Sequence, residues 1–280
     1  MDFVIKNLER KRKNLIRKLI IAVGGASLVF VFGFVMLISS SSRVIEPLVL
    51  LVLFYIVILF SMKFKVVNSF VALYNEALFS QISFDIKDIK YKRNAKSIKF
   101  IFKDLLKSNL GIFHTNDEFI GIYQGVKFGF CDASMELGAL NFKGKLFVAE
   151  FNKNFLTKIL ISNLGLLKSE GLSKIDIDNS YINENFTVFA EDITEAMYIL
   201  SPNLLEKFEL LTKDESDKKM RADILFYKGR IYLAMDTKND ALEPNLFKSI
   251  KSLDASLFIK EIEKFTNFIE FLKLNSKIYK

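Results

Sequence analysis

Few side chains in this sequence have the type and spacing that catalysis requires. His114 is the single histidine, which excludes a site built on two histidines, and its expected position is a loop between a helix and a strand. Cys131 is the single cysteine, which excludes an intrachain disulfide and a zinc site with paired cysteines. No cation in its run, FGFCD, would favour a thiolate, so a buried apolar role is expected. We therefore expect no metal and no cofactor.

Acidic side chains supply the only enzyme hypothesis that the sequence offers. The acids near the ends of expected strands and helices are Asp132, Glu136, Glu150, Glu191, Asp192 and Glu195. Of these, the candidate catalytic residues are Asp132, Glu136, Glu191 and Asp192. Paired carboxylates can transfer protons or hold a divalent cation, as a membrane-anchored hydrolase would require. However, Asp192 and Glu195 have the spacing of a helix N-cap and its N3 partner, which is a structural role. We favour a protein without catalytic activity and keep the hydrolase as the alternative.

Glycine provides no phosphate-binding motif. Gly121, Gly125 and Gly129 recur every four residues but do not form G-x-G-x-x-G, and the chain contains no G-K-[ST]. Glycines spaced in this way within paired strands are typical of turns and bulges.

The rest of the chain is organised by two apolar stretches near its N-terminus. One runs from Leu19 to Ile38 and the other from Pro47 to Met62, with residues 39–46 between them. The first stretch has no charged residue, and at 1.5 Å per residue its length matches a hydrocarbon core of about 30 Å. It is too long for the apolar part of a secretory signal, and no A-x-A-like cleavage site follows it. Residues 19–63 are therefore expected to form a transmembrane helical hairpin in contact with the lipid bilayer.

The distribution of charge predicts the orientation of this hairpin. The net charge of +8 divides into +5 for residues 1–18, +1 for residues 19–64 and +2 for the other 216 residues. The cations before the first stretch, together with Lys63 and Lys65 after the second, predict that both termini are cytoplasmic. The basic tail, residues 1–18, either lies among the lipid headgroups or only sets this topology. The nearly neutral remainder gives no electrostatic reason to expect nucleic acid as a partner.

An amphipathic stalk helix is expected at residues 64–83. Its apolar side chains, Val67, Phe70, Val71, Tyr74 and Leu78, recur at helical spacing on one face. Such a stripe needs a surface to cover it. The stalk could pack on the main domain of the same chain, but we expect it to bind another membrane protein or a second copy of the chain.

Residues 84–280 are expected to form a cytoplasmic α+β domain with a mainly antiparallel sheet and flanking helices. A first helix is expected at 97–108, with Gly111 as its stop, and a last helix at about 255–274. Two further helices are expected between them, one after the Asp192 cap and one that starts at Pro202. Strands are expected in 118–136, 145–151, 158–162, 174–178 and 186–189. The clearest hairpin covers 220–236 and turns at Lys228-Gly229. The polar run 85–96 is expected to be a boundary.

Two stretches of this domain carry recognisable motifs. Residues 142–147 and residues 185–202 resemble a bacterial family of membrane proteins, domain-of-unknown-function family 3137. Residues 142–147 (FKGKLF) are similar to the family's "fkGlf" pattern. Residues 185–192 and 195–202 (NFTVFAED and EAMYILSP) are similar to its "F.VY..D..EARYiLtP" run. The chain departs from this run at Phe189 and Ala190, where the family has a Tyr-Ser type of pair, and at Met197, where it has Arg. The family's later "FE" element is matched only loosely, at 242–243 or 246–247.

The resemblance extends over about residues 60–275 and includes the preceding hairpin. It implies an integral membrane protein with a cytoplasmic domain and implies no activity. It also points to a LemA-type membrane protein as a partner. Together with the residue patterns, it leads us to expect a multi-pass protein of the bacterial inner membrane that acts through interaction or assembly.

Overall fold

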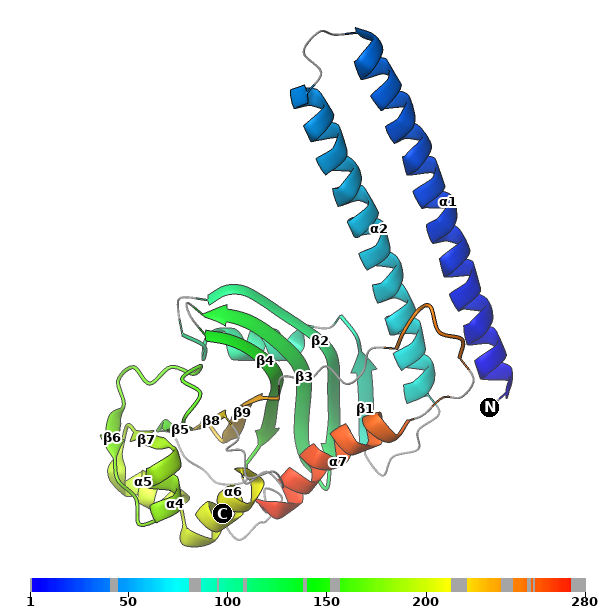
Figure 1. Ribbon diagram of the computed structural model, residues 1–280. Helices are drawn as coiled ribbons and strands as arrows, with labels where there is room; N and C mark the ends of the chain where they lie inside the picture. Colours follow the sequence, from blue (N-terminus) through cyan, green and yellow to red (C-terminus); the bar gives the residue numbers. More distant parts are fainter. Residues whose placement is uncertain are drawn as a thin grey trace. The chain divides into compact units, whose positions relative to one another are not determined.

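The fold is known from a computed structural model, which describes residues 2–40, 45–80, 87–94, 96–107, 110–137, 140–151, 157–212, 221–237, 244–250, 253 and 255–272. The chain forms two compact units (Figure 1). The first combines Met1–Ile82 with Glu243–Ala255, and the second combines Ser83–Leu242 with Ser256–Lys280. The chain therefore leaves the second unit after residue 242 and returns to it at residue 256.

Two long helices form most of the first unit. Helix α1 (Asp2–Ser40) is continuous from the basic tail into the first apolar stretch, and α2 (Ile45–Phe79) is continuous from the second stretch into the expected stalk. The basic tail is thus part of a helix that packs on the unit, because Leu8 and Arg12 are both buried. Each helix continues 17 residues, about 25 Å, past the charged end of its span.

Small and aromatic side chains hold the two spans together. The hydroxyl groups of Ser27 and Tyr55 are hydrogen-bonded at 2.6 Å, and the rings of Phe30 and Tyr55 lie 4.6 Å apart between centroids. A Cβ atom at Gly33 would lie 3.5 Å from Leu51, so a small residue there permits close packing. The helices therefore contact one another within the hairpin, as expected.

The second unit contains a sheet of nine antiparallel strands. Their order is β1-β2-β3-β4-β9-β8-β5-β7-β6, and the unit confirms the α+β class. The strands are β1 (Lys87–Lys92), β2 (Leu110–Tyr123), β3 (Val126–Leu137), β4 (Leu140–Glu150), β5 (Ile159–Ser162), β6 (Ser173–Ile175), β7 (Thr187–Ala190), β8 (Ala222–Tyr227) and β9 (Arg230–Asp236). The helices are α3 (Ser97–Lys103), α4 (Ser180–Asn185), α5 (Ile193–Ile199), α6 (Pro202–Thr212) and α7 (Ser256–Phe271).

Alternation along the central strands gives the sheet two apolar faces. Phe130 and Phe147 stack on Phe265 of α7, with ring centroids 4.3 Å and 4.9 Å apart. Their chain neighbours Cys131 and Leu146 belong to the buried cluster that includes Ile98 and Phe102 of α3. Because neighbouring strand residues point to opposite faces, α7 covers one face and α3 covers the other (Figure 1).

Two tight turns and two helices follow their local sequence. Lys228 and Gly229 both have positive φ, at 49° and 65°, as a two-residue hairpin turn requires. The predicted 220–236 hairpin, the Pro202 helix start and the last helix are confirmed as β8–β9, α6 and α7. Gly125 lies in the β2–β3 turn, as the glycine spacing predicted.

Three expectations about the start of the domain are wrong. The run 85–96 contains strand β1, and its Tyr91 is buried against Phe258. The lysines of β1 suit the edge of a sheet, because charged side chains prevent pairing with a further strand. Gly111 ends no helix, and His114 occupies no loop, because both lie in β2. Strand β2 starts eight residues before the expected strand region because pairing with β3 along its whole length overrides the local turn signals. Helix α4 was not expected at all.

Candidate functional site

The four candidate catalytic acids lie in two separate places. Asp132 and Glu136 are on β3, whereas Glu191 and Asp192 follow β7. Four strands lie between β3 and β7 in the sheet, which at about 4.8 Å per strand separates the pairs by about 24 Å. Among the described residues, no group of three or more His, Cys, Asp or Glu side chains is placed to hold a metal ion. The structure therefore does not bring these acids together.

Two of these acids have local structural partners. The Asp192 carboxylate accepts a hydrogen bond from the Glu195 N–H at 2.7 Å and so caps α5, as its spacing predicted. The Glu195 side chain accepts a hydrogen bond from the Thr157 hydroxyl. Glu191 accepts one from the Lys158 N–H at 3.2 Å. This region is built to start a helix.

Asp132 belongs to a buried ion triad that sequence patterns did not indicate. The Lys145 Nζ lies 2.5 Å from Asp132 and 2.9 Å from Glu261 of α7. Burial alone would lower the pKa of Lys145, but the two carboxylates outweigh it and raise this pKa above its usual value. Lys145 is therefore a charged link between the sheet and α7. The sequence signal that could have indicated this triad is the unexpected charge of Lys145 in the apolar strand FKGKLFVAE.

A second buried acid, Asp223 on β8, organises the loop after β5. Its carboxylate accepts hydrogen bonds from the backbone N–H groups of residues 164 and 165 at 3.1 Å each, and of 166 and 167 at 2.6 Å and 2.8 Å. The Ser162 hydroxyl donates a further bond at 2.5 Å. Within the described part of the chain, the partners of this carboxylate are backbone N–H groups and Ser162, so the acid has a structural role.

Cys131 is fully buried in β3, as its apolar neighbours predicted. Burial raises the pKa of its thiol well above the ordinary value, and the nearby carboxylates of Glu118 and Asp132 act in the same direction. The folded protein therefore presents an unreactive thiol.

An apolar cavity of about 160 Å³ lies between α3 and the sheet. Ile98, Ile101, Ile120 and Val148 line it, with Lys127 and Arg230 among its charged lining residues. None of the four candidate acids lines this cavity, so it does not complete a catalytic site from them.

The stripe predicted to be an interaction surface is largely covered within the chain. Phe70, Val71 and Leu78 are buried, and Val67 and Tyr74 are half-buried. The outward faces of the two spans are different: large apolar side chains such as Leu28, Phe32, Phe54 and Phe60 are exposed. Such a surface is expected where the solvent is lipid.

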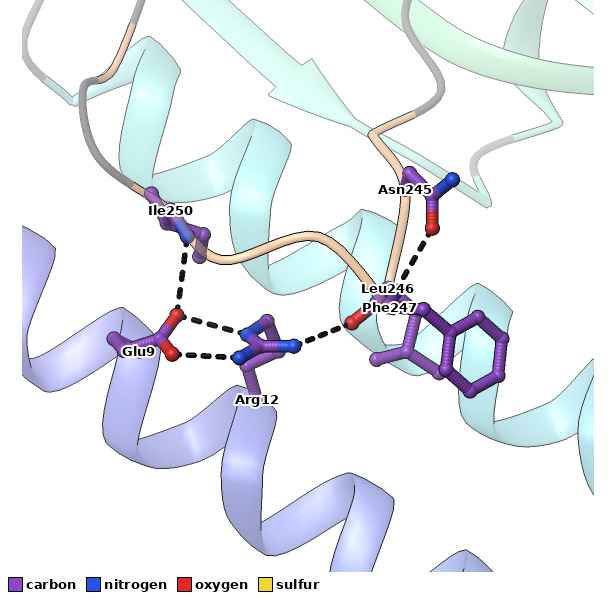
Figure 2. Close-up of polar contacts among 6 residues, drawn as sticks. All are labelled: Glu9, Arg12, Asn245, Leu246, Phe247 and Ile250. Carbon is purple, nitrogen blue, oxygen red and sulfur yellow. Dashed lines mark hydrogen bonds and ion pairs between the residues drawn. The ribbon is translucent and has the colours of Figure 1, made fainter.

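One group of polar contacts in the first unit holds the segment 244–250 against α1 (Figure 2). The Arg12 guanidinium donates two hydrogen bonds to Glu9, at 2.8 Å and 2.6 Å, and a third to the Leu246 carbonyl at 2.8 Å. Glu9 also accepts a bond from the Ile250 N–H at 3.2 Å. We call this arrangement the Glu9–Arg12 clamp.

Electrostatics and burial both support the clamp. The hydrogen bonds from Arg12 hold the pKa of the Glu9 carboxyl below its ordinary value, and Glu9 raises the pKa of Arg12. The Leu246 side chain is 2% exposed, so the segment is anchored by apolar burial as well as by charge. Arg12 thus differs from the other cations of the tail, Lys6, Arg10, Lys11, Lys13, Arg17 and Lys18, which are exposed.

The sequence model of a family described as "Protein of unknown function (DUF3137)" matches residues 140–274. The match confirms that this part of the chain, just under half of its length, is similar to the family that its motifs resemble. The match begins at β4, so it is shorter than the expected resemblance and leaves out the hairpin. Neither the curated proteins nor the solved structures include a significant match.

The motif glycine of this family has a clear physical role in this chain. Gly144 lies on β4 opposite Asp236 of β9, and a Cβ atom there would be 1.8 Å from the Met235 carbonyl oxygen. Only glycine permits this close approach of the two backbones.

Proposed function

We propose that this protein is anchored in the bacterial inner membrane by α1 and α2, with both termini in the cytoplasm, and that its domain acts by binding a protein partner or a second copy without catalysing a reaction. The observation that carries the proposal is the pair of long helices. Each contains an apolar stretch long enough to cross a bilayer, and no residue of that stretch is buried in the chain. A soluble protein would bury such surfaces.

Helix α5 supplies the surface proposed for the interaction. Ile193, Met197 and Tyr198 on this short helix are 56%, 45% and 65% exposed. They lie in the run that resembles the family motif and inside the region that the family model matches. A group of exposed apolar side chains on one helix is typical of a protein-binding surface. A LemA-type membrane protein is the partner that we propose to test first.

The topology is tested with single cysteines in intact, right-side-out inner-membrane vesicles. We expect a membrane-impermeant maleimide to label Ser41→Cys between the spans and to leave Ser276→Cys protected; both positions lie outside the described residues. Cys131 gives no background because its thiol is buried and its pKa is raised. Labelling of Ser276→Cys with protection of Ser41→Cys would mean the opposite orientation.

The interaction is tested by site-specific photo-crosslinking in cells. A photoreactive phenylalanine analogue replaces Tyr198 on α5, and the matched control carries it at Asn203, an exposed polar position on α6. We expect a discrete adduct from position 198 and none from position 203. The photoreactive group forms an adduct only where a partner covers it and excludes water. An adduct of twice the chain mass indicates self-assembly, and a different mass indicates another protein. Equal crosslinking at both positions would contradict a role for α5.

A further inference from the structure

The segment held by the Glu9–Arg12 clamp displays an aromatic side chain to its surroundings. Leu246 points into the unit, whereas Phe247 is 60% exposed. The turn itself is ordered by hydrogen bonds: the Asn245 side chain accepts from the Phe247 N–H at 2.9 Å, and the Asn245 carbonyl accepts from the Lys248 N–H at 3.2 Å. Figure 2 shows the Phe247 ring pointing away from the Glu9–Arg12 pair. The exposure of Phe247 is therefore a fixed property of the turn.

The clamp sets the distance of this ring from the apolar span. Arg12 precedes Leu19 by seven residues on the continuous helix α1, which corresponds to about 10 Å along its axis. Leu246 is held by Arg12 and Ile250 by Glu9, so the 246–247 end of the segment is the end nearer the span. The headgroup layer adds about 5–8 Å to each side of the hydrocarbon core. The gap that remains between this level and the headgroup layer is within the length of a phenylalanine side chain that points toward the span.

The charges at this level suit an anionic lipid surface. Lys248 beside Phe247 is exposed, and so are Lys11, Lys13 and Arg17 on α1. Each cation near an anionic leaflet is attracted to its negative surface. An exposed aromatic ring among cations is the composition of segments that lie in the membrane interface.

We propose that Phe247 and Lys248 form a membrane-contact site, in which Phe247 enters the headgroup layer of the cytoplasmic leaflet and Lys248 pairs with anionic lipid phosphate. The proposal rests on the proposed membrane anchor. The Glu9–Arg12 clamp is the positioning device, since it holds the turn at a fixed depth on α1.

Tryptophan fluorescence in lipid nanodiscs tests the site, because the chain has no tryptophan. Three full-chain variants each carry one reporter: Phe54→Trp in the second span, Phe247→Trp, and Phe3→Trp at the far end of α1. All three positions are exposed and belong to the first unit. Lipids brominated near the headgroup should quench Phe247→Trp clearly more than Phe3→Trp, and this quenching should increase with the share of anionic lipid and fall with added salt.

The reference variants separate the two proposals. If Phe54→Trp is quenched by lipids brominated deep in the acyl chains while Phe247→Trp is quenched no more than Phe3→Trp, the contact site is wrong and the anchor stands. If Phe54→Trp is not quenched, the anchor itself is wrong. A Phe247→Cys variant with a fluorescent thiol label provides the same comparison should the tryptophan disturb the turn.

A matched pair of substitutions tests the role of the clamp. In the Phe247→Trp background, Arg12→Gln removes the bonds to Glu9 and Leu246, whereas Arg10→Gln removes an equal charge from an exposed position. We expect Arg12→Gln to reduce the quenching and Arg10→Gln to preserve most of it. Equal quenching in the two variants would show that the clamp does not position Phe247.

Discussion

Asp223→Ala is expected to destabilise the second unit by about 4 kcal/mol. The alanine removes the acceptor of four backbone N–H groups in residues 164–167 and of the Ser162 hydroxyl. Each buried donor left without a partner costs about 1–3 kcal/mol before the loop relaxes. Asp223→Asn is expected to recover only part of this loss, because its amide keeps one acceptor oxygen and directs N–H groups at the donors that the other carboxylate oxygen accepts from.

Cys131 reports the unfolding of this unit without any added probe. Its thiol is buried in β3, so the fraction labelled by a short pulse of thiol reagent in increasing urea follows the unfolded population. The control is Asp176→Ala, which removes an exposed carboxylate of the same unit and should change the free energy of unfolding by less than about 0.5 kcal/mol. A similar result for Asp223→Ala and Asp176→Ala would contradict the structural role of Asp223.

Lys145→Met is expected to lower the free energy of unfolding by about 3–5 kcal/mol at pH 8. The substitution leaves the buried carboxylate of Asp132 and the partly buried carboxylate of Glu261 without the cation between them. A second change, Glu261→Leu in the Lys145→Met background, removes one of the two charges and should restore part of the stability, because apolar replacements of buried ion groups are often neutral. If Lys145→Met unfolds at the same urea concentration as the wild type, the triad does not stabilise the unit.

The pH dependence distinguishes lost charge from lost packing. In the wild type the pKa of Lys145 is raised, so its contribution is complete below the unfolded value of about 10.5 and is lost only as the pH rises through the higher folded value. In Lys145→Met the unpaired carboxylates should have raised pKa values, so the folded state takes up a proton as the pH falls. The stability difference from the wild type should therefore shrink between pH 8 and pH 5. A difference independent of pH would indicate packing alone.

Local signals in the sequence predicted the elements that depend on neighbouring residues. The apolar lengths of the spans, the Lys228-Gly229 turn, the Asp192 cap and the Pro202 helix start all depend on contacts within a few positions. Strand β1 was missed because a lysine-rich run resembles a linker until its partner β2 is known. Composition alone cannot distinguish an edge strand from a polar boundary.

The clamp and the buried acids were missed for a related reason. Asp223 contacts a loop about 60 positions earlier, Lys145 pairs with an acid more than 100 positions later, and Arg12 bonds to Leu246 across most of the chain. No spacing rule connects residues at such separations. The odd charge in an apolar strand, as at Lys145 and Asp223, was the only sign that a partner must exist.

The passage of the chain from the second unit to the first and back after β9 makes the two units difficult to separate. Three backbone crossings connect the two units, at residues 82–83, 242–243 and 255–256. A protease that cuts once, between Phe79 and Lys87, breaks a single crossing and leaves the segment 244–250 bound to α1 through Arg12 and Glu9. A fragment that starts at residue 84 likewise carries Leu246 away from Arg12 of α1. Separation of the two units therefore requires cuts at all three crossings, or one cut between Phe79 and Lys87 together with release of the clamp.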